Sequence, residues 1–123
     1  MNKDTIFIPG HVPSSKNSRV WTGRFFVQSK ACQTYKKQSE HFWSQNKQVF
    51  LGIIKDKSKP YRIELFFYRK TRHKFDYINA AQIVCDQMTS FGWIEDDNAD
   101  EIIPVFIPYE YNKEHPGVRI TIL

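Results

Sequence analysis

Apolar residues recur with the spacing of strands in some segments and of helices in others. The clearest strand is Tyr61–Arg69, in which aliphatic and aromatic residues on one face alternate with a more mixed face. Residues 5–8 predict a short first strand that ends at Pro9-Gly10. Residues 20–27 predict a hairpin that turns at Thr22-Gly23.

Two segments have the apolar spacing of helices. Ser29 is a suitable N-cap for a helix over residues 30–48. A second helix is predicted over Tyr77–Ser90, and Gly92 is a frequent terminator just beyond it. Its apolar stripe is expected to pack in the core and consists of Ile78, Ala81, Cys85 and Met88.

The remaining segments complete an α+β pattern. Residues 50–60 predict an exposed loop, and residues 101–109 and 118–123 predict two strands that pair antiparallel. The order β, hairpin, α, β, α, β, β indicates a two-layer α+β domain, with two main helices on one face of a mixed sheet. At this length we expect residues 1–123 to form a single domain.

Charge is divided unevenly along the chain, whose net charge is +5. Residues 1–74 carry 16 Lys and Arg against 4 Asp and Glu, whereas residues 75–123 carry 2 against 9. Such segregation indicates one surface for a polyanion and one acidic site.

Other features predict a cytoplasmic protein with no membrane partner. No apolar run reaches the length of a membrane-spanning helix, and the N-terminus lacks the apolar core of a signal peptide. Cys32 and Cys85 lack zinc-ligand spacing, so we expect two buried thiols in a reducing compartment.

A basic segment, residues 69–74, precedes the second helix. Four of its side chains are expected to contact nucleic-acid phosphates. They are Arg69, Lys70, Arg72 and Lys74. The loop over residues 11–19 contributes Lys16 and Asn17 to the same surface; an ordinary connecting loop is the alternative.

Carboxylates lie at both ends of the second helix. Asp76 precedes it, and Asp97 lies in the acidic loop after it. Metal-dependent phosphodiester cleavage needs two or three carboxylates near a phosphate-holding surface, because the ion stabilises negative charge and activates water. Asp76 and Asp97 meet this need if the chain folds back past the helix. Alternatively, Asp76 caps the helix and the acidic loop is simply solvated.

Three short motifs occur in a fixed order. Residues 76–82 read DYINAAQ, Gly92-Trp93 follows the helix, and Asp96-Asp97 comes next. Upstream, residues 13–17 read PSSKN. Together these resemble the RusA family of Holliday junction resolvases, small endonucleases common in phages and prophages. The family has a Pro-Ser-x-x-Asn loop, then D-x-D-N-x-x-K, a helix, a Gly-aromatic turn and D-D.

The resemblance implies a homodimer that binds branched DNA and makes paired nicks with Mg²⁺ or Mn²⁺, with no small-molecule cofactor. It also implies roles for single residues. Asp76 matches the first metal-binding Asp, and Asn79 matches the Asn of the motif. Asp97 matches the Asp that completes the metal site, with Asp96 beside it.

Two positions depart from the family pattern. Ile78 stands at the second Asp and Gln82 at the Lys, so a metal ligand and a positive charge are missing. We favour Glu64 or Asp96 as the replacement ligand over Asp86, which is roughly 10 Å along the helix from Asn79. Lys74 is the expected substitute for the missing Lys.

Three functions remain open. The first is a metal-dependent, structure-selective endonuclease that resolves four-way junctions. The second is a catalytically weakened or inactive relative that binds branched DNA without cleaving it. The third is a non-catalytic single-stranded nucleic-acid binder that stacks bases on Trp21, Phe25 and Phe26.

Overall fold

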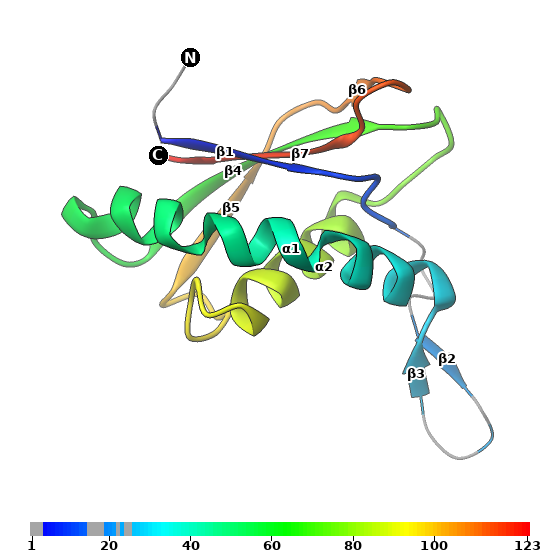
Figure 1. The fold of residues 1–123 in the computed structure, drawn as a ribbon, viewed down its shortest axis with the longest axis horizontal. Helices are drawn as coiled ribbons and strands as arrows, with labels where there is room; N and C mark the ends of the chain where they lie inside the picture. Colours follow the sequence, from blue (N-terminus) through cyan, green and yellow to red (C-terminus); the bar gives the residue numbers. More distant parts are fainter. Residues whose placement is uncertain (1–3, 15–18, 22, 24–25) are drawn as a thin grey trace.

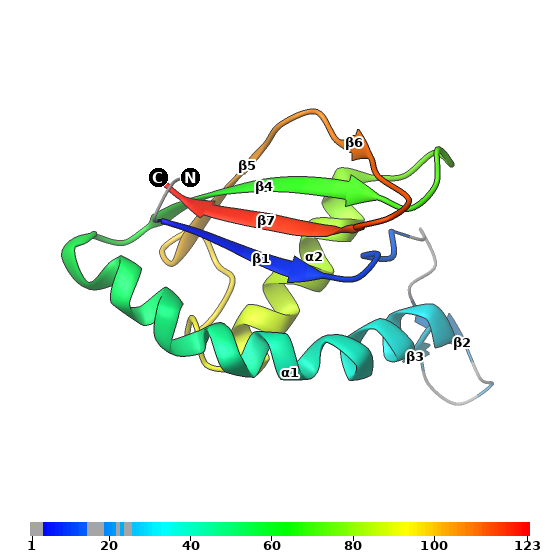
Figure 2. The same ribbon diagram turned by 45° about the horizontal axis from the view of Figure 1, so that its top comes forward.

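A computed structural model describes residues 4–14, 19–21, 23 and 26–123, and it confirms the predicted two-layer α+β fold. A mixed sheet forms one layer, and α1 and α2 pack together on one of its faces (Figures 1 and 2). The strands of this sheet are β1 (Thr5–Pro9), β4 (Tyr61–Arg69), β5 (Ile102–Phe106), β6 (Glu110–Tyr111) and β7 (Gly117–Ile122).

The strand β4 lies between β7 and β5, in the order β1-β7-β4-β5. β7 pairs antiparallel with both β1 and β4, whereas β5 pairs parallel with β4. The predicted hairpin of the last two long strands is therefore wrong. The helix α2 connects β4 to β5 and so supplies the crossover connection that two parallel neighbouring strands need. The last strand, β7, lies between β4 and β1.

The predicted hairpin near the N-terminus is confirmed. β2 (Arg19–Trp21) and β3 (Phe26–Gln28) pair antiparallel, with Val20 opposite Val27. This pair lies apart from the main sheet, at the N-terminal end of α1 (Figure 1).

The first helix, α1, spans Lys30–Ile53 and continues into the short 3₁₀ helix η1 (Ile54–Asp56). Ser29 caps it as predicted, because its Oγ accepts a hydrogen bond from the Cys32 N–H at 3.2 Å. The exposed loop predicted from residue 50 is wrong at its start. Phe50 is fully buried and stacks on Trp93, with ring centroids 5.0 Å apart. This packing stabilises the helix beyond residue 48, where the sequence predicted its end.

The second helix, α2, spans Tyr77–Ser90 as predicted, and Gly92 follows with a positive φ of 75°. Three members of the predicted stripe are buried, but Ile78 is 74% exposed, so its expected place in the core is wrong. Tyr77 faces the core instead, and its ring packs against Phe106 at 5.5 Å. The buried face therefore begins one residue earlier than the stripe suggested.

Cys32 and Cys85 are both buried free thiols, as predicted. Burial, together with the nearby charges of Asp97 and Asp86, raises the pKa of the Cys85 thiol to about 12. Within the described residues, no helix combines the length and apolar character needed to cross a membrane.

Candidate active site

Two carboxylates converge on one side chain of α2. The Gln82 Nε2 donates to Asp86 Oδ1 at 2.8 Å and to Asp97 Oδ2 at 3.0 Å. Asp86 is one turn further along the helix, and Asp97 returns from the loop after it. Because one NH₂ group reaches both, Asp86 and Asp97 lie on either side of it.

The loop after α2 returns because Trp93 anchors it. The buried Trp93 indole N–H donates to the Trp43 carbonyl at 2.9 Å, and the Trp93 backbone N–H donates to the Met88 carbonyl at 2.8 Å. Asn98 then organises the turn, since its Oδ1 accepts from the Asp100 N–H at 2.9 Å. The chain thus reverses and brings Asp97 back about two helical turns, to the level of Gln82.

A lysine from the other helix joins this group. Lys36 Nζ of α1 lies 3.5 Å from Asp86 Oδ2. Both side chains are partly exposed, so this ion pair contributes little to stability. The ion pair matters for the chemistry of the site, because the flexible Lys36 side chain brings a positive charge to a hollow that Asp86 and Asp97 also line. We call Lys36, Gln82, Asp86 and Asp97 the acidic site.

The sequence places Asp86 behind Glu64 and Asp96, because Asp86 is about 10 Å along the helix from Asn79. Gln82 is only one turn before Asp86, and Lys36 is not among the candidates from the sequence. For Lys36 the sequence holds no clear signal, because several lysines of α1 lie on its surface and only the packing of α1 on α2 selects one.

Asp76 occupies the N-cap position of α2 but is exposed, and within the described part of the chain its side chain makes no capping hydrogen bond. The capping alternative is therefore not supported. Gln82 is six residues further on, about 9 Å along the helix axis. Six residues place Asp76 and Gln82 on different faces of the helix. Asp76 is not among the residues that line the hollow beside Asp86 and Asp97, so the structure does not bring together the two carboxylates expected to share a metal ion.

The proposed replacement ligands have different positions. Glu64 lies on the face of β4 opposite the buried Ile63 and Leu65, which pack toward the helices. The sheet therefore separates Glu64 from the acidic site, against expectation. Asp96 borders the same hollow as Asp97, where its Oδ2 accepts from Asn98 Nδ2 at 2.9 Å.

The basic segment divides into one buried and three exposed cations. Arg69 is only 4% exposed and donates to the Val12 carbonyl, so we correct its expected role as a surface phosphate contact. Lys70, Arg72 and Lys74 are exposed, and the Arg72 guanidinium lies 4.2 Å from the centre of the Tyr111 ring. These three exposed side chains can contact a polyanion at the surface.

The other expected DNA contacts are placed only in part. Asn79 Nδ2 lies 3.5 Å from the Ser14 carbonyl and links α2 to the loop after β1. Lys16, Asn17 and Phe25 lie outside the described residues, and so do the side chains of Trp21 and Phe26.

In the residues that the structure describes, no three His, Cys, Asp or Glu side chains are grouped closely enough to hold a metal ion by themselves. The chain matched neither any protein-family model nor any curated protein. The acidic site must therefore be interpreted from its own chemistry.

Proposed function

We propose that the protein is a metal-dependent, structure-selective endodeoxyribonuclease that resolves four-way DNA junctions by paired nicks. The observation that carries this proposal is the convergence of Asp86 and Asp97 on Gln82, on the helix that follows an exposed basic segment. The resemblance of residues 76–97 to the RusA motif supports the same reaction. A homodimer suits this substrate, because a two-fold assembly presents one site to each of two strands.

The donors of the acidic site fit Mg²⁺ or Mn²⁺. Such ions take one or two carboxylates and keep several waters. Rotating the Gln82 side-chain amide by half a turn exchanges its nitrogen for Oε1, which is an oxygen ligand. Asp97 and Asp86 would hold the ion with that oxygen, and Asp96 is close enough to hold one of its waters. When bound, the ion would stabilise charge on the phosphorane and lower the pKa of the attacking water.

The remaining residues orient the DNA. Lys70, Arg72 and Lys74, which are exposed, bind backbone phosphates. Lys36 supplies the positive charge that the family places at residue 82, since it can move from Asp86 to a phosphate oxygen. This role replaces the one that the sequence suggested for Lys74.

A second candidate function keeps the DNA and drops the cleavage. The Gln82 amide satisfies both carboxylates without an ion, and Ile78 offers no ligand. This arrangement favours a protein that binds branched DNA and leaves it intact. Both candidate functions predict binding to branched DNA, and only the first predicts cleaved DNA as the product.

The test uses the pure protein with labelled four-way junction, linear duplex and single strand, each with Mg²⁺, Mn²⁺ or EDTA. We expect paired nicks in the junction alone, and only with metal. Tight junction binding without nicks at any metal concentration would favour the second candidate. A preference for the single strand would contradict both.

A further inference from the structure

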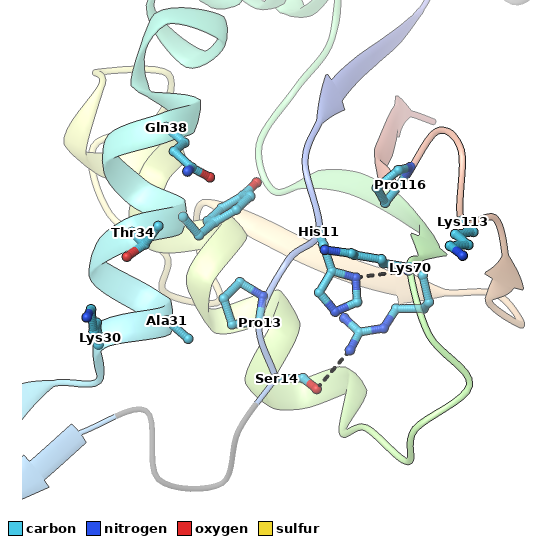
Figure 3. Close-up of a pocket in the computed structure, with 12 residues that line it drawn as sticks. His11, Pro13, Ser14, Lys30, Ala31, Thr34, Gln38, Lys70, Lys113 and Pro116 are labelled. Atoms are coloured by element: carbon cyan, nitrogen blue, oxygen red, sulfur yellow. Dashed lines mark hydrogen bonds between the residues drawn. The ribbon is translucent and has the colours of Figure 1, made fainter.

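A second hollow lies between α1, the loop after β1 and the end of β4 (Figure 3). Its volume is about 800 Å³. Figure 3 shows Lys30 and Thr34 on the α1 side, His11 and Ser14 in the middle, and Lys113 opposite. We call this hollow the basic pocket. It shares no residue with the acidic site.

The basic pocket is strongly and uniformly positive. Five basic residues line it, and none of the described lining residues is acidic. These five are His11, Lys30, Arg69, Lys70 and Lys113. Among the described residues, none of them forms an ion pair with a carboxylate.

The positive charge of Arg69 has no negative partner among the groups described around it. Its guanidinium is enclosed by neutral groups: the Val12 carbonyl, Ser14 Oγ at 3.4 Å and the Phe75 ring, whose centre is 4.2 Å away. Its Nε is buried and has no hydrogen-bond partner among the described atoms. Burying a cation without a counter-charge is costly, so an anion in the adjoining pocket would relieve that cost.

Neutral donors also border the pocket. His11 Nδ1 accepts from the Lys70 backbone N–H at 2.9 Å, so the proton of the neutral ring is on Nε2. Ser14 Oγ accepts from Arg69 and keeps its own hydrogen for another acceptor. Burial, together with the nearby charges of Arg69, Lys70 and His73, lowers the pKa of His11 to about 4. At neutral pH, His11 is therefore a donor within a positive field.

We propose that the basic pocket binds a phosphate group, carried by a nucleotide or by the end of a nucleic-acid strand. A phosphate has enough charge and oxygen atoms to engage several lysines together with Ser14 and His11. The volume exceeds that of phosphate alone, and Tyr35, Pro13 and Pro116 provide apolar walls for an attached nucleoside. This proposal does not depend on metal-dependent cleavage.

The test is a titration of the full chain at constant ionic strength, with NMR signals of the His11 ring and the Lys70 amide as readouts. Inorganic phosphate and deoxyadenosine monophosphate are expected to shift both signals and to raise the pKa of His11, because a dianion stabilises the imidazolium. Deoxyadenosine and added chloride are expected to shift neither. Equal shifts with chloride, or none with phosphate, would overturn the proposal.

The source of the phosphate is identified by comparing short oligonucleotides with and without a 5′-phosphate. Binding at least about 10-fold tighter with the phosphate supports a strand end as the ligand, and equally tight binding of the mononucleotide supports a free nucleotide. Lys113→Gln, an exposed change that the fold tolerates, is expected to weaken phosphate binding about 5-fold. Lys55→Gln, in η1 beyond the C-terminal end of α1, is the matched control. Unchanged affinity in Lys113→Gln would count against the pocket.

Discussion

Ile78 stands where the resolvase motif has a carboxylate, and its side chain is 74% exposed. It is four residues before Gln82, so the two side chains lie on the same side of α2. An Asp at residue 78 would project into solvent next to the acidic site. The departure from the motif is therefore a difference in surface chemistry, which the fold does not require.

Ile78→Asp is expected to change the free energy of unfolding by less than about 1 kcal/mol, because no buried contact is lost. Ala81→Asp, on the buried face of the same helix, is the control and is expected to cost several kcal/mol. Urea denaturation measures both. Equal destabilisation would mean that Ile78 is part of the core in solution.

Ile78→Asp also tests the chemistry of the site. It adds a carboxylate one helical turn before Gln82, where it can help Asp86 and Asp97 to hold the ion, so the rate of junction nicking in Mg²⁺ is expected to rise at least about 10-fold. A gel assay at saturating protein measures this rate. No increase, with junction binding intact, would show that the missing carboxylate is not what limits cleavage.

At the scale of elements, β7 holds the sheet together because it pairs with both β1 and β4. A Cβ at Gly117 would come within 2.6 Å of the Ile8 carbonyl oxygen and would also collide with the Phe7 ring. The close approach of β1 therefore requires glycine at this position.

Gly117→Ala is expected to destabilise the protein by about 2–4 kcal/mol, because the backbone of β1 cannot move aside without losing its pairing. Gly52→Ala is the matched control, since a Cβ there meets no described atom within 4 Å. Better helix propensity near the end of α1 is expected to stabilise that variant by up to about 1 kcal/mol. Thermal unfolding compares the two. Similar effects at both sites would contradict the tight packing of β1 on β7.

Local patterns predicted the elements better than their pairing. Alternation along Tyr61–Arg69 and the cap at Ser29 are properties of neighbouring residues, and both are confirmed. The parallel pairing of β5 with β4 depends on contacts between residues about 40 apart, which no local pattern encodes. The burial of Phe50 likewise depends on Trp93, far along the chain.

The candidate site shows the same division. The motif pointed to Asp97 and to position 82, which the structure brings into contact, but not to Asp86 and Lys36 beside them. Gln82 differs from the motif residue, and its contact with Asp97 forms only once the loop after Trp93 is folded. Arg69 looked like the other cations of its segment, and only the packing of the loop after β1 buries it.

At the scale of the whole molecule, His11 couples stability to pH. Its folded-state pKa of about 4 lies below the value of about 6.5 that an unfolded chain shows. The unfolded state therefore binds more protons between these values, and stability is lost as pH falls from about 6.5 towards 4.

His11→Asn keeps an acceptor for the Lys70 N–H and removes the titration. The variant is expected to lose less stability than wild type between pH 7 and pH 4, by up to about 3 kcal/mol. Urea denaturation at the two pH values gives the difference. His41→Asn, on the exposed surface of α1, controls for loss of a histidine. A wild-type pH dependence in His11→Asn would contradict the account.

Charge segregation along the sequence becomes two separate sites in the folded molecule. The acidic site lies along α2, and the basic pocket lies on the other side of the same turns of α1 that carry Lys36. Exposed cations of residues 70–74 adjoin the pocket at one end and α2 at the other. In the proposed function, DNA held by these cations would lie between the basic pocket and the acidic site.

The most direct test of the central claim is the rate of four-way junction nicking as a function of Mg²⁺ concentration. It compares wild type with Asp86→Asn and Asp97→Asn, using Asp100→Asn in the same exposed loop as the control. The account predicts that both site variants lose about 100-fold or more in rate while junction binding and the control remain unchanged. Nicking by Asp97→Asn at the wild-type rate, or none by wild type at any Mg²⁺ concentration, would contradict it.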